Sequence, residues 1–164
     1  MKVWDPVVRS LHWTLAALVV FDLVYDDGGW GHRMVGYAAA VVVLLRLTWA
    51  AVSGGHSLKP SISATLAYVR LLRRGTPPRS AGHDPLGLWM VWLLWTLVLL
   101  LGLTGWMSRL DAFWGDDRVH DAHAVLAYLL MAAVAVHVLG VVVMSVLWKE
   151  NLPAAMITGI KRAE

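Results

Sequence analysis

Four histidines in this sequence lie on long apolar stretches: His12 and His32 near the starts of the first two, and His123 and His137 on the last. An ionisable side chain costs free energy at most depths of a bilayer, so a recurrent set of this kind predicts a functional site. Imidazole is an axial ligand of haem iron, and the set therefore indicates haem binding and electron transfer. For one histidine alone, a hydrogen-bonded polar residue or a wet interface residue is the simpler interpretation. Four histidines with consistent spacing argue against this simpler interpretation.

Helical geometry sorts these histidines into two pairs. His123 and His137 are fourteen residues apart, which places them on one helix face, within ~40° of each other and about 21 Å apart along the axis. Orientation and depth then pair His32 with His123 at an outer haem and His12 with His137 at an inner haem. The inner pair differs in depth, because His12 lies near its helix start, and tilt and overhang of the long last helix close that gap. His120 points about 100° away from His137 and is the weaker candidate. Zinc fits less well, because its sites gather three or four ligands at one point and this pattern supplies two per level.

Three arginines are candidate partners for haem propionates, since a guanidinium offers forked donors to a carboxylate. Arg9 lies three residues before His12, and Arg46 lies fourteen residues after His32 on the same helix face. Both are expected near the inner haem, and Arg33 near the outer one. The alternative for Arg46 and Arg33 is snorkelling to lipid headgroups, because both lie at helix ends.

The composition indicates one integral membrane domain over residues 1–164. Hydrophobic residues make up 59% of the chain and charged residues only 15%, whereas soluble domains are about 45–50% apolar. The chain has no cysteine. This excludes disulfides, thiolate-bound iron–sulfur clusters and covalent c-type haem attachment, and leaves b-type haem open.

Four apolar stretches approach the ~20 residues that a helix needs to cross the hydrocarbon core. Asp5-Pro6 and Asp84-Pro85 predict helix starts, because Asp caps helices and Pro is favoured in the first turn. The third stretch carries no charge and no histidine, so we expect it to pack rather than to ligate. The sequence thus predicts an all-α, four-helix membrane bundle with spans at about 6–25, 31–52, 86–107 and 122–148.

Basic residues predict the orientation of this bundle. Both termini and the long second connection fall on one side, which carries 11 of the 14 Lys and Arg residues, so the positive-inside rule makes that side cytoplasmic. Residues 61–74 of the connection resemble a short amphipathic surface helix, for which simple anchoring is the plainer role. His56 and His83, also in this connection, are expected to be solvated. The eleven are Lys2, Arg9, Arg46, Lys59, Arg70, Arg73, Arg74, Arg79, Lys149, Lys161 and Arg162.

Several motifs along the chain resemble one family. They are Asp5-Pro6 with Arg9-x-x-His12-Trp13, Gly82-His83-Asp84-Pro85-Leu86-Gly87 with Met90, His123 with His137, and Glu150-Asn151-Leu152 with the segment from Ala155 to Lys161. Together they look like the bacterial cytochrome b561 superfamily, and most like the b-type cytochrome subunit of nickel–iron hydrogenases and its stand-alone relatives. The resemblance implies a multi-pass cytochrome of the bacterial inner membrane with two b-type haems. It also implies electron transfer between the quinone pool and a periplasmic redox partner, such as a c-type cytochrome or a hydrogenase, within a respiratory chain.

Three classes of function stay open at this point. The first is the electron conduit just described, with membrane lipid, quinone and a redox protein as partners. The second is an enzyme that oxidises superoxide and reduces quinone, and the third is a haem-binding membrane component without a redox role. We expect no nucleic-acid partner, and whether the chain forms a homodimer stays open.

Charge on the outer side separates the first two classes. An acidic surface repels the superoxide anion and attracts a basic protein, which favours the conduit. Only Arg33, Arg109 and Arg118 are expected on that side as bases. The seven acids expected there are Asp22, Asp26, Asp27, Asp111, Asp116, Asp117 and Asp121.

Overall fold

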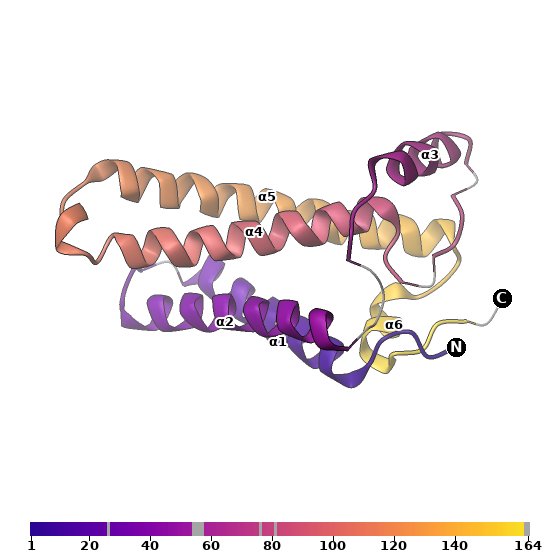
Figure 1. Cartoon of the computed structure of the whole chain (residues 1–164), viewed down its shortest axis with the longest axis horizontal. Helices are drawn as coiled ribbons and strands as arrows, with labels where there is room; N and C mark the ends of the chain where they lie inside the picture. The colour runs from indigo at the N-terminus through magenta and orange to yellow at the C-terminus, as the bar shows by residue number, and fades with distance from the viewer. Residues whose placement is uncertain (26, 54–57, 76, 81, 163–164) are drawn as a thin grey trace.

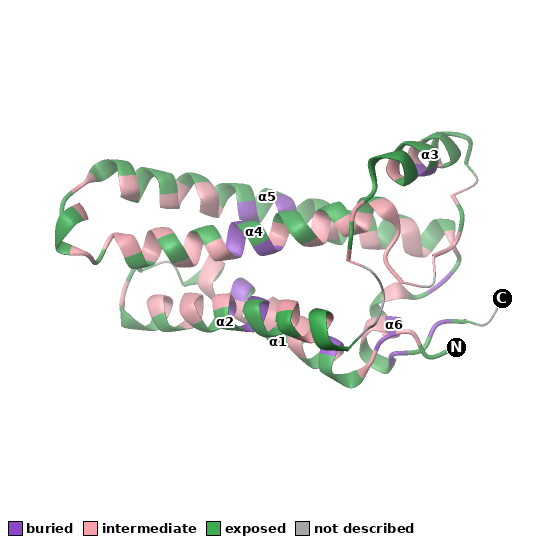
Figure 2. Cartoon of the chain, in the orientation of Figure 1, coloured by how far each residue is buried: buried purple, intermediate pink, exposed green. Residues whose placement is uncertain are grey.

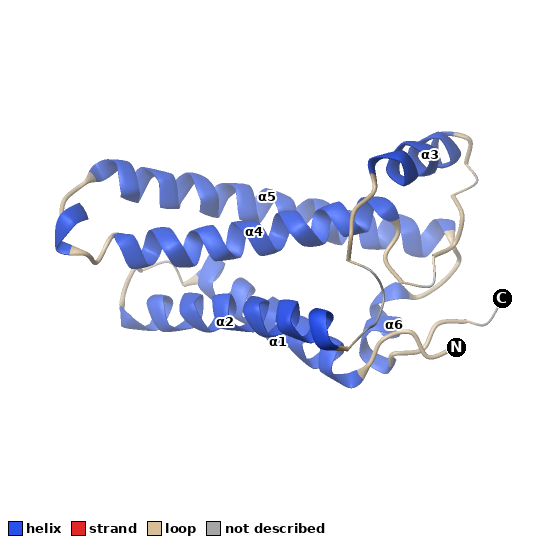
Figure 3. Ribbon diagram, in the orientation of Figure 1, coloured by secondary structure: helices blue, strands red, loops and turns tan. Residues whose placement is uncertain are grey.

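The computed structural model describes residues 1–25, 27–53, 58–75, 77–80 and 82–162. The described residues form helices and no β-strand (Figure 3). In chain order the elements are α1 (Pro6–Val24), α2 (Trp30–Val52), α3 (Ile62–Arg73), α4 (Pro85–Met107), the 3-10 helix η1 (Asp111–Phe113), α5 (Asp117–Leu147) and α6 (Leu152–Thr158).

Four of these helices are long and apolar enough to cross a membrane: α1, α2, α4 and α5. They form two antiparallel hairpins, α1 with α2 and α4 with α5, which meet through α2 and α4 (Figure 1). Buried positions lie mainly near the middle of the bundle, and exposed positions run along its outer faces (Figure 2). Because those faces are rich in Leu, Val and Trp, they suit a lipid environment, and the predicted all-α membrane bundle is confirmed.

Aspartate caps three of the helices, α1, α4 and α5, as expected for the first two. Asp5 accepts a hydrogen bond from the backbone N–H of Val8, at 2.9 Å, and Asp84 accepts from the first turn of α4. The expected span ends agree with the structure to within one residue, except at the start of the last span. There Asp116 caps α5, which begins at Asp117 rather than near 122. The last helix is therefore one turn longer at this end than its apolar stretch.

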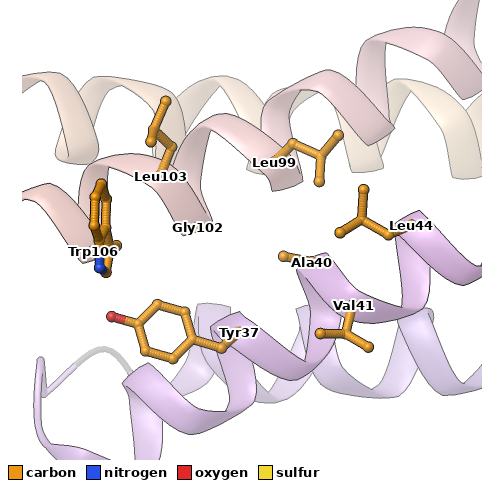
Figure 4. Close-up of a pocket in the computed structure, with 8 residues that line it drawn as sticks. All are labelled: Tyr37, Ala40, Val41, Leu44, Leu99, Gly102, Leu103 and Trp106. Atoms are coloured by element: carbon orange, nitrogen blue, oxygen red, sulfur yellow. The ribbon is translucent and has the colours of Figure 1, made fainter.

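The core of the bundle is a cluster of small and large apolar side chains in which Val43 is fully buried. Helices α2 and α4 approach closely at Gly102, where an added Cβ would lie 3.2 Å from the Cβ of Ala40. Beside this contact is an apolar cleft of about 370 Å³, with Tyr37 and Trp106 facing each other at one end (Figure 4). Their position suits the aromatic belt of a membrane interface.

The two ends of the bundle differ. One end, which we call the hairpin end, carries the α1–α2 turn and the α4–α5 connection with η1 (Figure 1). The opposite end, which we call the terminal end, carries both chain termini, α3 and α6. Helix α3 lies where residues 61–74 were expected, buries Tyr68 and holds Trp89 through a 3.1 Å hydrogen bond from the indole Nε1 to Thr65.

The last described residues of the chain contact its first residues at the terminal end. The N-terminal ammonium donates to the carbonyl oxygen of Lys161 at 2.6 Å, and the backbone N–H groups of Val3 and Trp4 donate to the carbonyl oxygen of Gly159. Arg79 makes a two-pronged ion pair with the buried Glu150, at 2.8 and 3.1 Å. The hydrogen bond from Arg79 lowers the pKa of Glu150 below its ordinary value. These contacts tie α6 to the start of α1.

A substitution at Gly159 tests the contact between α6 and the start of α1. The φ of Gly159 is +79°, and an added Cβ would lie 2.6 Å from the carbonyl oxygen of Trp4. We expect Gly159→Ala to destabilise the protein by about 1–3 kcal/mol, because both the backbone conformation and the contact become strained. Thermal denaturation in detergent measures this loss, and Gly140→Ala is the matched control because an added Cβ there meets nothing within 4 Å. Equal midpoints for the two variants would contradict the role given to Gly159.

Candidate functional site

The structure brings together two of the predicted histidines at the hairpin end. His32 comes from the first turn of α2 and His123 from the second turn of α5. Their ring centroids lie 6.1 Å apart, with the ring planes inclined by 75°. Residues 91 positions apart in the chain therefore form one pair, which we call the hairpin-end pair.

A partner on α4 holds the ring of His123. Its Nδ1 lies 2.8 Å from the hydroxyl oxygen of Thr104, which also lies 2.9 Å from the carbonyl oxygen of Leu100. A hydroxyl has one proton to donate, so when Thr104 donates to Leu100 it accepts from Nδ1–H of His123. In that tautomer the lone pair of His123 is on Nε2, as a metal ligand requires.

His32 faces a carboxylate in the same way. Its Nδ1 lies 3.2 Å from Oδ1 of Asp22, which is near the end of α1. Both atoms are buried, and neither has a well-aligned hydrogen-bond partner among the described residues. Both histidines of the pair thus turn Nδ1 toward a polar side chain of the bundle, which leaves Nε2 for a ligand.

The separation of the two rings fits one iron atom between them. A metal–imidazole bond is ~2.0–2.1 Å long and the nitrogen lies ~1.2 Å from the ring centroid, so two imidazoles that shared one metal ion would place their centroids up to ~6.4 Å apart. The observed 6.1 Å agrees with this value. Helix α5 packs closely on α4, whereas α1 and α2 are not among its close partners in the described part of the chain. The two histidines of the pair therefore come from helices that do not pack closely on each other, which is compatible with a group bound between them. The residues present therefore fit a bis-histidine haem.

The other two histidines lie toward the terminal end. His12 on α1 and His137 on α5 are within electrostatic range of each other. Nδ1 of His12 is buried and has no hydrogen-bond partner among the described residues, while its ring makes an edge contact with Trp13 at 5.1 Å. An unpartnered buried imidazole nitrogen calls for an explanation, and a group bound at this nitrogen would supply one. We call His12 and His137 the terminal-end pair.

The three arginines have partners within the chain. A guanidinium N–H of Arg9 donates to the carbonyl oxygen of Ile157, and Nε of Arg33 donates to the carbonyl oxygen of Gly29 at 3.3 Å. The guanidinium of Arg46 lies over the ring of Trp95, 5.6 Å from its centroid. Their role toward haem propionates stays a prediction. Arg9 and Arg46 lie at the terminal end, as that prediction requires.

The remaining histidines differ from one another. His120 is exposed, one turn before His123. His83 was expected to be solvated, but it packs against Trp4 with ring centroids 4.9 Å apart. His56 lies outside the described residues. Within the described part of the chain, no group of three or more His, Cys, Asp or Glu side chains is placed to hold a metal ion, so the histidines stand as pairs.

Comparison with known proteins decides the family. The family model for prokaryotic cytochrome b561 matches residues 3–159. The chain belongs to the prokaryotic cytochrome b561 family. The resemblance seen in the sequence motifs is thereby confirmed. No curated protein and no solved structure matches the chain.

Family membership, together with four membrane-spanning helices, makes this cytochrome b561 a multi-pass membrane protein. It implies b-type haem and electron transfer within the membrane. The sequence analysis did not place Asp22 or Thr104 beside the histidines, where the structure has them. The helix that carries Thr104 was expected only to pack, yet it orients a histidine. Thr96 and Thr104 are the two hydroxyl side chains in this otherwise apolar span, and those hydroxyls were the available signal.

Single histidine substitutions test the two pairs. Because each pair lies at its own level, His123→Ala and His32→Ala should remove one and the same haem component, and His137→Ala and His12→Ala should remove the other. Reduced-minus-oxidised spectra of the purified variants measure this loss. His120→Ala is the matched control and should keep both components, since its side chain is exposed. Loss of both components in every variant would instead indicate a role in folding.

Proposed function

We propose that this cytochrome b561 carries two b-type haems and transfers electrons across the membrane between the quinone pool and a redox protein. His32 and His123 hold the outer haem, and His12 and His137 hold the inner one. The observation that carries the proposal is the 6.1 Å separation of the His32 and His123 rings. Two levels on one helix, about 21 Å apart along α5, supply a path that a purely structural haem would not need.

Bound haem supplies a one-electron iron couple at each level. The residues of this chain bind it through imidazole nitrogens, orient those imidazoles and exclude water. Thr104 sets the tautomer of His123, and Leu130 and Ala133, buried on α5 between the two histidine levels, keep that interval apolar. The surrounding bundle therefore excludes water from the interval between the two levels and holds the histidines in fixed positions.

The charge distribution supports an orientation with the terminal end in the cytoplasm. Eleven of the 14 Lys and Arg residues fall on that side, in agreement with the positive-inside rule. The outer haem then faces the periplasm of a bacterial inner membrane. Quinone would react near the inner haem, where His12 and Trp13 lie, and the Trp13 indole N–H donates to the carbonyl oxygen of Met156 at 3.3 Å.

Acidic residues at the hairpin end support a basic protein partner. Asp27, Asp111, Asp117 and Asp121 are exposed, and Asp116 pairs with Arg118 at 3.2 Å. The expectation that Asp22 belongs to this surface was wrong, because its carboxylate faces His32. Asp26 lies outside the described residues. The exposed acids disfavour superoxide oxidation, because a negatively charged surface repels the superoxide anion.

Haem content tests the two-site proposal. We expect purified protein to carry two b-type haems per chain, since the chain supplies two histidine pairs. Pyridine haemochrome absorbance against protein concentration by amino-acid analysis measures the ratio. A ratio that stays near one after reconstitution with excess haem would refute the second site.

Ionic strength tests the partner surface. Electron transfer between the reduced protein and a basic c-type cytochrome should slow as salt rises, because the screening length falls from ~10 Å at 0.1 M to ~3 Å at 1 M. Stopped-flow rates on protein in detergent measure the effect. A triple variant in which Asn replaces Asp111, Asp117 and Asp121 should show the same slower electron transfer at low salt.

Arg73→Gln with Arg74→Gln is the matched control for that variant. Both arginines are exposed at the C-terminal end of α3, at the opposite end of the bundle, so the rate should not change. Rates that do not depend on salt, or a faster reaction with superoxide than with the cytochrome, would contradict the protein conduit and favour the small-molecule oxidoreductase.

A further inference from the structure

Asp22 is a carboxylate inside a membrane-spanning helix, and nothing in the electron path described so far requires it. Its side chain is 18% exposed and that of His32 is 21% exposed, with Oδ1 and Nδ1 3.2 Å apart. A charged side chain at this position costs free energy in a bilayer unless it has a partner, and such residues commonly mark function. The partner here is a histidine of the hairpin-end pair.

The neighbouring helix is shaped to admit this carboxylate. Gly36 lies one turn after His32 on α2, and an added Cβ there would stand 3.1 Å from Oδ2 of Asp22. That distance is shorter than ordinary van der Waals contact, so any larger residue at position 36 would press on the carboxylate. Asp22, His32 and Gly36 thus form one arrangement built from two helices.

The two histidines of the hairpin-end pair have unlike partners. His123 is held by the neutral hydroxyl of Thr104, whereas His32 faces a group that can bear a full negative charge. A carboxylate that accepts from Nδ1–H makes the imidazole a stronger electron donor to a metal on Nε2. A stronger donor stabilises ferric iron more than ferrous iron, which lowers the reduction potential.

We propose that Asp22 is a positioning residue for the outer haem, which accepts the Nδ1–H of His32, presents Nε2 to the iron and lowers the reduction potential of that haem. This inference rests on the proposed function, because it takes His32 to be a ligand. A purely structural tether between α1 and α2 would use the same contact. That role would leave the potential unchanged.

The Asp22→Asn variant tests the proposal, because Asn keeps the size of the side chain and removes its charge. Potentiometric titration of the purified protein, followed in the haem α band, should show the outer haem easier to reduce. At a fixed potential its ratio of reduced to oxidised form should rise about tenfold, which is ~59 mV for one electron. The inner haem should not change. The outer component is identified as the one that His123→Ala removes.

Asp27→Asn is the matched control, since it removes an exposed charge at the same end of the bundle. It should leave both potentials unchanged, which separates a direct contact from a general effect of surface charge. The low-spin ferric signal in electron paramagnetic resonance is a second measurement. It should change for one haem only in Asp22→Asn, because the donor strength of one axial ligand has changed.

Gly36→Ala keeps the carboxylate but displaces it, and it should shift the outer potential in the same direction. This variant decides the matter if Asp22→Asn fails to retain the outer haem. An unchanged outer potential in a variant that holds both haems would overturn the role of Asp22 and leave the proposed function intact. If His32→Ala instead kept both haem components, the ligand assignment itself would be wrong.

Discussion

A buried imidazole has two ring nitrogens that need partners, and the hairpin end of the bundle is arranged around that requirement. In the hairpin-end pair, Thr104 and Asp22 lie against the Nδ1 atoms, so Nε2 is the atom left on each ring. Three helices besides α5 contribute to this one level. Helix α5 packs closely on α4 rather than on α1 or α2, yet its His123 lies beside His32 of α2.

The terminal end depends on a different set of interactions. The closing segment from Glu150 to Lys161 is held by backbone hydrogen bonds to the first residues and by the Arg79–Glu150 pair. Lys161 is buried among carbonyl oxygens and the rings of Trp4 and Trp148, and burial lowers its pKa. These contacts hold α6 beside His12 and Trp13. The region where quinone is proposed to react is thus covered by residues from both ends of the chain.

The sequence predicted the bundle well because its signals are local. Asp-Pro pairs mark two helix starts, and length with hydropathy marks the spans. The pairing of His32 with His123 also followed from helix geometry and depth. What the sequence did not predict are contacts that depend on which helices become neighbours and on side-chain direction. Asp22 was expected on the surface and faces His32, and His83 packs on Trp4. The early start of α5 was missed because its first turn is polar and lies outside the apolar stretch.

The central claim is that each level is a bis-histidine haem site. Electron paramagnetic resonance of the fully oxidised protein tests it most directly, because the signal reports the spin state and axial ligands of each ferric haem. The account predicts two low-spin signals of bis-imidazole type, with areas that sum to two haems per chain. A high-spin signal of comparable area, or a single low-spin species in protein loaded with excess haem, would contradict it.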